Sequence, residues 1–269
     1  MLTRAIVRPT ALNFSEGLTT GKLGAPDYEI AMRQHEAYCA ALEQCGLMLS
    51  RLEADSKYPD STFVEDVAVL FEALPHGRAT APDAEHCAVL ARPGAASRLG
   101  EIANMRTVLA DVFPSLHEIN APGTLDGGDV CEAGSHFFIG ISERTNEAGA
   151  RQLAEVLSEF GYTSSFVDIR KANGLLHLKS GIAYLGDTHL VVTEALAGRA
   201  QFADYDLVRV DRGEEYAANC VRINEHVLVA AGYPKFEAKL RQLGYRTIAL
   251  EMSEFQKMDG GLSCLSLRF

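Results

Sequence analysis

Short apolar runs separated by polar, glycine-containing turns recur along the chain and predict a repeated structural unit. The clearest copy has two β-like runs around a tight turn at Gly134 and Ser135, a helix closed by Gly161, and a third β-like run. We predict these elements over residues 129–133, 137–141, 143–160 and 165–169. The pattern therefore changes from the period of a strand to that of a helix and back within each copy.

The same order of hairpin, helix and strand is found in three further copies. Their predicted elements are 62–71, 87–92, a helix capped by Ser97 and 116–121; 181–185, 189–193, a short helix near Ala200 and 207–210; and 220–224, 227–231, 234–243 and 245–250. In the last of these, Pro234 suits the first position of a helix. Four complete copies argue for an architecture built from similar units.

The two ends of the chain supply the pieces of a fifth copy. They are a strand over 3–9, a helix capped by Asp27 and closed by Gly46, a strand over 47–52, and a C-terminal strand that begins at Cys264. We therefore predict a closed ring of five ββαβ units, with the last strand beside the first. An ordinary α/β sandwich is the alternative. Because no linker-like stretch separates the units, residues 1–269 are predicted to form a single domain.

Composition and charge narrow the classes of partner. The chain has 269 residues, a formal net charge of −11 and a pI near 5.2, which argues against nucleic acid or an anionic membrane as a partner. No apolar run reaches membrane-spanning length, and the N-terminus lacks the apolar core of a signal peptide. We expect a cytoplasmic protein.

The cysteines do not form a zinc-binding pattern. They are Cys39, Cys45, Cys87, Cys131, Cys220 and Cys264. Their spacing is irregular and contains no Cys-x-x-Cys pair, which disfavours a structural zinc site. A large cytoplasmic chain is expected to keep such cysteines reduced.

Unusual polar residues recur at one point in each unit, the start of its first hairpin strand. They fall in the stretches 60–66, 126–129, 177–180, 217–220 and 259–264. Taken singly, each has a structural explanation: Asp126 and Asp129 suit turns, His177 suits a buried core, and Cys264 suits a small apolar site. Because equivalent positions of a ring meet near its axis, we predict that together they line one cavity.

Several segments together resemble the dimethylarginine dimethylaminohydrolase family, which belongs with arginine deiminases and amidinotransferases among the guanidine-modifying enzymes. The segments are 60–66, 92–98, 125–129, 144–146, 177–180, 218–220 and 259–264, and the resemblance extends over nearly the whole chain. It implies a five-bladed α/β propeller, which agrees with the repeat count. Two features depart from the family pattern: Leu99 replaces a second basic residue, and the insert over 74–86 is long.

The resemblance implies a role for each matching residue. Cys264 is the expected nucleophile, His177 the general acid and base, and Asp126 the carboxylate that orients His177. The residues expected to contact substrate are carboxylates for a guanidinium, arginines for an α-carboxylate, and apolar side chains around them. They are Asp60, Glu65 and Asp66; Arg98 and Arg144; and Phe63, Leu262 and Leu18, the last at a lid position. The resemblance implies no metal or organic cofactor, and a homodimer is one expected form.

The implied reaction is the hydrolysis of N-ω-methylated arginines to citrulline and dimethylamine or methylamine. Nearby carboxylates disfavour a thiolate, so we expect Cys264 to rest as a neutral thiol and to ionise when a cationic substrate binds. Arginine deiminase and amidinotransferase activities are alternatives that use the same thiol, although deiminases of this kind are longer. A catalytically silent binder of arginine-like ligands and a Cys/His zinc site are further alternatives, neither of which accounts for the full residue set.

Overall fold

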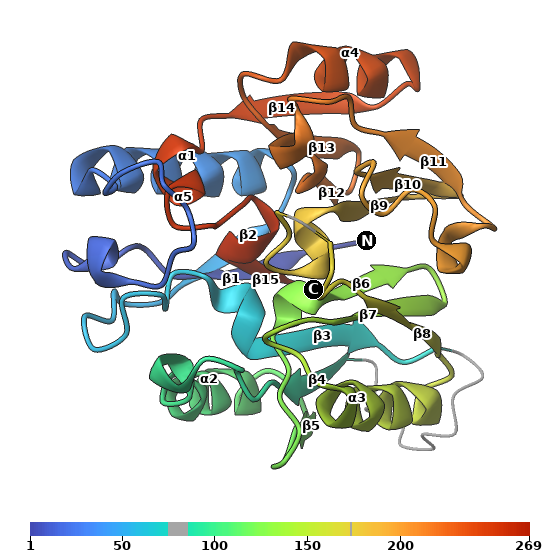
Figure 1. Cartoon of the computed structure of the whole chain (residues 1–269). Helices are drawn as coiled ribbons and strands as arrows, with labels where there is room; N and C mark the ends of the chain where they lie inside the picture. The colour runs from blue at the N-terminus through green and yellow to red at the C-terminus, as the bar shows by residue number, and fades with distance from the viewer. Residues whose placement is uncertain (75–85, 173) are drawn as a thin grey trace.

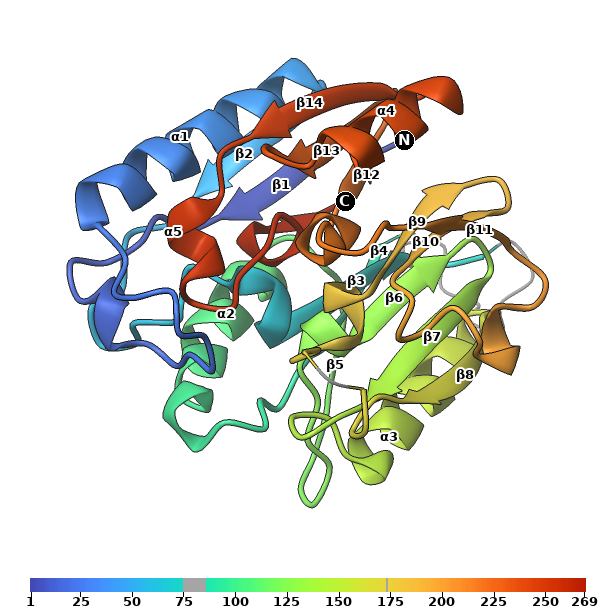
Figure 2. The same cartoon turned by 45° about the horizontal axis from the view of Figure 1, so that its top comes forward.

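The computed structural model describes residues 1–74, 86–172 and 174–269. Five three-stranded sheets surround a central axis, and the helices lie at the periphery (Figures 1 and 2). The strand orders are β15–β1–β2, β3–β4–β5, β6–β7–β8, β11–β10–β9 and β12–β13–β14. The five-unit α/β propeller predicted from the repeats is therefore confirmed. Most of the predicted 74–86 insert, residues 75–85, lies outside the described residues.

The strands are short. They comprise β1 (Arg4–Val7), β2 (Met48–Arg51), β3 (Ala68–Glu72), β4 (His86–Leu90), β5 (Ser115–Glu118), β6 (Val130–Ala133), β7 (His136–Ile141), β8 (Thr163–Asp168), β9 (Ile182–Gly186), β10 (His189–Val192), β11 (Asp206–Arg209), β12 (Val221–Ile223), β13 (His226–Ala230), β14 (Arg246–Leu250) and β15 (Ser266–Arg268). In each unit the first two strands pair antiparallel and the last pairs parallel to the middle strand.

The two ends of the chain close the ring. β15 pairs antiparallel with β1, with Ile6 opposite Leu267, and β1 pairs parallel with β2. The connection between β1 and β2 contains the helix α1. A strand from the C-terminus thus supplies the position that the first hairpin strand fills in the other units, as the sequence predicted.

The α-helices are α1 (Tyr28–Gln44), α2 (Glu101–Ala110), α3 (Glu147–Glu159), α4 (Pro234–Gln242) and α5 (Ser253–Gln256). The cap of α1 is confirmed because the Asp27 side chain accepts a hydrogen bond from the amide of Ile30 at 2.9 Å. The unit of β9–β11 carries only the 3₁₀ turn Ala200–Phe202 near the predicted short helix. Within the described residues, the length and apolar character of the helices fall short of what crossing a membrane requires.

Two predicted helix starts were wrong. Helix α3 begins at Glu147 rather than residue 143, because the Asn146 side chain accepts a hydrogen bond from the amide of Gly149 at 2.8 Å and caps the helix there. Ser97 does not cap α2. It lies in the 3₁₀ turn Ala96–Arg98, and α2 begins after Gly100 without a side-chain cap.

Five apolar clusters form the core, and each draws side chains from two neighbouring units. In one of them Phe71 of β3 meets Phe137 of β7, with ring centroids 6.1 Å apart. In another, Ile6 and Leu267 of the closing sheet pack with Leu90 of β4. Both faces of a sheet are therefore covered, which explains why many strands have apolar residues in succession rather than in alternation.

A short 3₁₀ turn precedes the first hairpin strand of every unit. These turns are Val64–Val67 before β3, Gly127–Asp129 before β6, Leu178–Ser180 before β9, Glu215–Ala218 before β12 and Ser263–Leu265 before β15. They gather around the middle of the molecule (Figure 1). Three predicted strand starts were therefore wrong, since Val64–Val67, Asp129 and Cys264 belong to these turns. The turns gather the polar residues at the axis, whereas an extended strand would point alternate side chains to opposite faces.

Candidate active site

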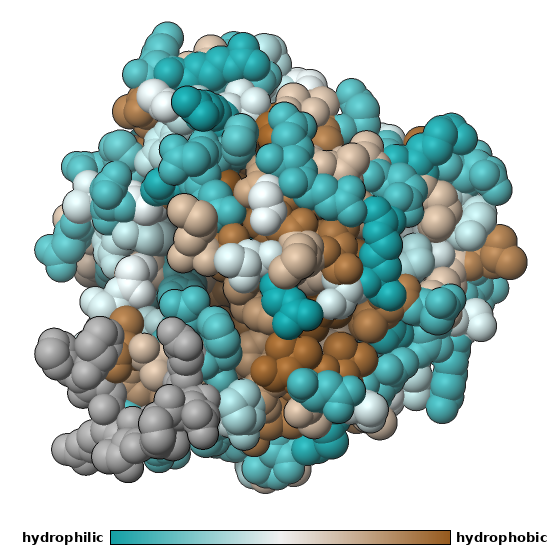
Figure 3. Space-filling model, turned by 180° about the vertical axis from the view of Figure 1, so that it is seen from behind, coloured by the Kyte–Doolittle hydropathy of each residue, from teal (hydrophilic) through white to brown (hydrophobic). Residues whose placement is uncertain are grey.

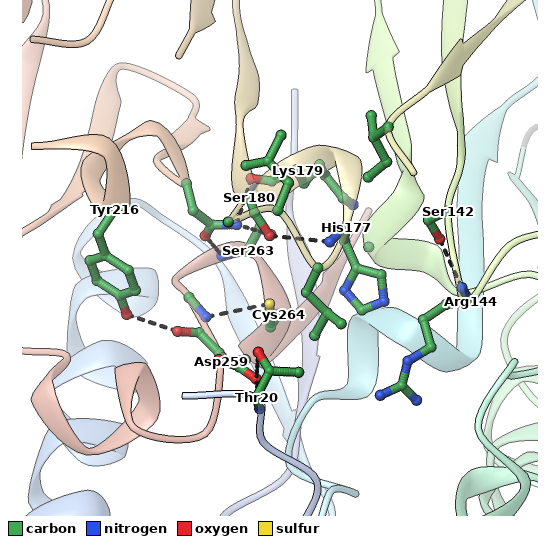
Figure 4. Close-up of a pocket in the computed structure, with 18 of the residues that line it drawn as sticks. Thr20, Ser142, Arg144, His177, Lys179, Ser180, Tyr216, Asp259, Ser263 and Cys264 are labelled. Atoms are coloured by element: carbon green, nitrogen blue, oxygen red, sulfur yellow. Dashed lines mark hydrogen bonds between the residues drawn. The ribbon is translucent and has the colours of Figure 1, made fainter. Parts of the chain in front are cut away.

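A cavity of about 640 Å³ opens where the five turns meet. Of the residues predicted for the site, Cys264, His177, Arg144 and Glu65 line this cavity. The first three are labelled in Figure 4. They come from three different units and from the closing strand segment, so the ring alone brings them together. The structure thus places the expected nucleophile and the expected general acid in the same cavity.

Cys264 lies in a turn whose backbone is fixed by its neighbours. The thiol is buried, with 8% of the residue exposed, and its Sγ accepts a hydrogen bond from the amide of Gly261 at 3.4 Å. The Tyr216 hydroxyl donates to the carbonyl of Gly260 at 2.8 Å. A Cβ on Gly260 would overlap the ring of Phe63. Glycine is required there because an aromatic ring packs directly against the backbone.

His177 lies beside two carboxylates that come from other units of the ring. Its Nε2 lies 3.0 Å from Asp126 Oδ2, and its Nδ1 lies 3.9 Å from Asp66 Oδ1. The other oxygen of Asp126 accepts a hydrogen bond from the amide of Gly94 at 2.9 Å. Asp126 therefore has the position expected of a residue that orients the imidazole and balances its charge.

The local charges set the protonation states. Burial disfavours the charged imidazole, but the charge of Asp66 and the hydrogen bond with Asp126 outweigh it and raise the pKa of His177 to about 9. Burial followed by the charges of Glu65 and Asp66 raises the pKa of the Cys264 thiol to about 12. Near neutral pH the site thus holds an imidazolium beside a neutral thiol, in the direction expected from the sequence.

The carboxylates expected to hold a guanidinium are all buried, and each is already anchored. Asp66 accepts hydrogen bonds from the amide of Gly128 at 3.0 Å and from Arg98. Asp60 accepts a hydrogen bond from the amide of Leu18 at 2.9 Å, and burial raises its pKa. Asp60 and Asp66 thus stand behind the cavity lining, close to the residues that form it.

The two arginines predicted to clamp a carboxylate have different surroundings. Arg98 is only 4% exposed, and its guanidinium bonds Asp66 at 2.5 Å, Glu101 at 2.9 Å and the carbonyls of Asp60 and Phe63. Arg98 therefore lies in the buried support beneath the site and does not line the cavity, and its contact with a substrate carboxylate stays a prediction. Arg144 lies half-buried in the lining, and its side chain extends into the cavity (Figure 4).

The predicted apolar contacts also have distinct positions. Phe63 and Leu262 are buried in the core cluster that packs around α1, so they support the turn of Cys264 from beneath. Leu18 is 39% exposed in the loop that its amide ties to Asp60. Contacts of Phe63 and Leu262 with a ligand, and the lid role of Leu18, stay predictions.

Comparison with known proteins identifies the family. No family model matches the chain. The curated N(G),N(G)-dimethylarginine dimethylaminohydrolase of Pseudomonas aeruginosa is 40% identical over 270 residues, which cover 100% of both chains. The chain belongs to the dimethylarginine dimethylaminohydrolase family. A family member of Streptomyces coelicolor is 32% identical over 271 residues, 98% of this chain and 96% of the relative.

A solved structure supports the same assignment. The Pseudomonas aeruginosa enzyme, as a mutant complexed with citrulline, superposes with a TM-score of 0.91 and 39% identity over 100% of both chains. The family resemblance inferred from the sequence is therefore confirmed, together with the propeller fold. The similarity to the family therefore extends over the whole chain and is not confined to one segment.

Some residues of this dimethylarginine dimethylaminohydrolase family site had no predicted role. Asn219 accepts a hydrogen bond from the amide of Ser263 and donates one to the carbonyl of Lys179, both at 2.9 Å. It thus joins the turn of Cys264 to the turn of His177. Its place at the start of its unit was visible in the sequence, but its partners were not, because they are 40 and 44 residues away.

Glu65 is the centre of a second buried connection. Its carboxylate lies 2.6 Å from Lys179 Nζ and 3.2 Å from Arg268, and it accepts a hydrogen bond from the Ser263 hydroxyl at 2.7 Å. The predicted neighbour of the guanidinium-binding carboxylates is therefore fully paired within the protein. In this geometry the carboxylate neutralises two half-buried cations behind Cys264.

One group of side chains could approach a cation. The ligand atoms of Asp66, Asp126 and His177 lie within 4.8 Å of one another. Asp126 is, however, bonded to His177 and to the amide of Gly94, while Asp66 is paired with Arg98. This arrangement suits a protonated imidazole better than a metal ion. A site without a metal or organic cofactor stays a prediction.

Proposed function

We propose that the protein hydrolyses N-ω-methylated arginines to citrulline and dimethylamine or methylamine. The observation that carries the proposal is the convergence of Cys264 and the His177–Asp126 pair on one cavity, in a chain similar to dimethylarginine dimethylaminohydrolases from end to end. A binder of arginine-like ligands would need the carboxylates and Arg144, but not the thiol and the imidazole.

Charge would select and orient the substrate. A guanidinium is a delocalised cation, and the carboxylates of Asp60 and Asp66 lie behind the cavity where they attract it. Arg144 is free of side-chain hydrogen bonds and ion pairs within the described ranges, so it would bind the α-carboxylate at the other end of the substrate. The substrate would then lie with its central guanidino carbon toward Cys264.

In the first half of the reaction, the bound cation lowers the pKa of the Cys264 thiol, which releases its proton to solvent. The thiolate sulfur attacks the central carbon, and the imidazolium of His177 gives its proton to the departing amine nitrogen. The carbon–nitrogen bond then breaks, which leaves an S-alkylthiouronium group on Cys264. Asp126 would keep His177 oriented throughout.

In the second half, neutral His177 takes a proton from a water molecule, and the resulting hydroxide attacks the same carbon. The carbon–sulfur bond breaks, and the product leaves as a neutral ureido compound. The hydroxyl proton that the ureido group loses passes to the departing thiolate, which is no longer stabilised by a bound cation, and His177 is once more an imidazolium. The protons therefore balance over the cycle.

One assay tests the proposal. The protein is incubated with arginine, monomethylarginine, asymmetric dimethylarginine and agmatine, and the ureido product is measured, with Cys264→Ser as the blank. We expect turnover of the two methylated arginines, and agmatine, which lacks the α-carboxylate, to be a much poorer substrate. A preference for unmethylated arginine would instead favour the deiminase alternative. A homodimer and a cytoplasmic location stay predictions.

A further inference from the structure

The turn that carries Arg144 is fixed by a buried hydroxyl. The Ser142 Oγ accepts hydrogen bonds from the amides of Arg144 and Thr145, both at 3.0 Å. The same hydroxyl donates to Asp129 Oδ2 at 2.6 Å. Ser142 and Asp129 are both buried. The backbone of Arg144 is therefore bonded, through one serine, to a carboxylate in the interior.

The other oxygen of this carboxylate holds the turn that follows His177. Asp129 Oδ1 accepts a hydrogen bond from the amide of Leu178 at 2.9 Å. A single carboxylate thus connects the two turns that present Arg144 and His177 to the cavity. Each connection spans two units or two distant segments of one unit, so neither turn is positioned by its own strand alone.

The opposite side of the Arg144 turn is in close contact with a neighbouring unit. A Cβ at Gly94 would overlap the carbonyl oxygen of Arg144, so only glycine fits there. The side chain of Thr145 accepts a hydrogen bond from the amide of Asp126 at 3.1 Å. The turn is therefore enclosed between Gly94 on one side and the Asp129–Ser142 pair on the other.

We propose that Asp129 and Ser142 are positioning residues that fix Arg144 for the carboxylate end of the substrate. This inference rests on the proposed function, in which Arg144 binds the α-carboxylate. A long arginine side chain without a fixed partner depends on its backbone for its position. Holding that backbone before the substrate arrives reduces the ordering cost of binding.

The test compares a substrate that carries the α-carboxylate with one that lacks it. Ser142→Ala is assayed with asymmetric dimethylarginine and with dimethylagmatine, its decarboxylated counterpart. Losing one buried hydrogen bond should reduce kcat/KM for dimethylarginine about fivefold, mainly through KM, and leave dimethylagmatine unchanged. Asp129→Asn should reduce the same preference and should also lower kcat for both substrates, because the His177 turn loses its anchor as well.

Tyr162→Phe is the matched control. This substitution also removes one hydroxyl, which donates a hydrogen bond to the carbonyl of Glu72 at 2.8 Å. Tyr162 lies in the same unit as Ser142 but away from the cavity. We expect Tyr162→Phe to leave kcat/KM unchanged for both substrates. Thermal unfolding of each variant checks that the fold is retained.

The outcomes separate this inference from the proposed function. Equal losses toward both substrates in Ser142→Ala would assign the serine a structural role and overturn the inference, while the proposed function would stand. A wild-type protein that turns over the two substrates equally would overturn both the clamp role of Arg144 and the inference. A wild-type protein inactive toward both would reject the proposed function itself.

Discussion

The two ends of the ring's central axis are lined by different parts of the same five chain segments. Each segment consists of a 3₁₀ turn and the inner strand that follows it, β3, β6, β9, β12 or β15. The cavity that holds Cys264 and His177 is formed by the turns that precede those strands. A second hollow, of about 770 Å³, lies on the opposite face and is lined largely by the strands themselves. Figure 3, drawn from that side, shows apolar residues gathered around the middle of the face. Strand side chains such as Val69, Phe71 and Phe137 line this second hollow, where turn residues line the first.

The comparison teaches that position along an inner strand determines its chemistry. Successive side chains of a strand point in turn toward the two neighbouring units. Both faces of the strand are therefore covered, and its side chains are mostly apolar. Side chains in the preceding turns meet at the axis and bond one another across units. The two cavities share Glu65, Lys179, Asn219 and Ser263 in their linings. A largely buried polar layer therefore lies between the face of the Cys264 cavity and the apolar face.

The largest expected effect is the difference in activity between substitutions of two buried cysteines, one on each face. Cys264→Ser should reduce turnover of dimethylarginine by at least about a thousandfold, because the proposed covalent step would lose its nucleophile. Cys131→Ser changes a cysteine that lines the rear hollow and should keep activity within a factor of about three. Steady-state assays and circular dichroism measure activity and fold. Substantial turnover by Cys264→Ser would contradict the assigned nucleophile.

A smaller effect is the difference in stability between substitutions at the two ends of one segment, the turn Val64–Val67 and the strand β3 that follows it. Glu65→Gln would leave Lys179 and Arg268 without their shared counter-charge, and we expect unfolding free energy to fall by about 3 kcal/mol. Glu72 ends the same strand in an exposed pair with His86. Glu72→Gln should change stability by about 0.5 kcal/mol or less. Urea unfolding measures both, and similar values would show that the polar layer does not stabilise the ring.

The smallest effect is a difference between two histidine pKa values. Burial acts on both residues, but carboxylates raise the pKa of His177 to about 9, whereas burial lowers that of His136, at the rear end of β7. Titration followed by nuclear magnetic resonance should show this order, and Asp126→Asn should lower the pKa of His177. The His177 pairing should stabilise the fold fully below pH 6.5 and lose its effect as the pH rises through about 9. A pKa below 7 for His177 would mean that the resting site holds a neutral imidazole, and would contradict the imidazolium proposed to protonate the departing amine.

The sequence by itself determined the number of units and the place of the chemistry. Hairpin, helix and strand patterns depend on local periodicity, which is why all five units and the closure of the ring could be predicted. The recurrence of polar residues such as Asp126, His177 and Cys264 before the first strand of each unit depends on symmetry, because equivalent positions meet at an axis. Both features are visible without knowing any long-range contact.

Only the tertiary structure decided which side chains face the cavity and which support it. Arg98 and Arg144 lie in equally suggestive motifs, yet one is buried against Asp66 and Glu101 while the other extends into the cavity. The start of α3 moved to Glu147 because the preceding residues form the turn that presents Arg144. These outcomes depend on partners far apart in the chain. Periodicity records whether a residue is buried, but not which distant group satisfies its charge or its hydrogen bonds.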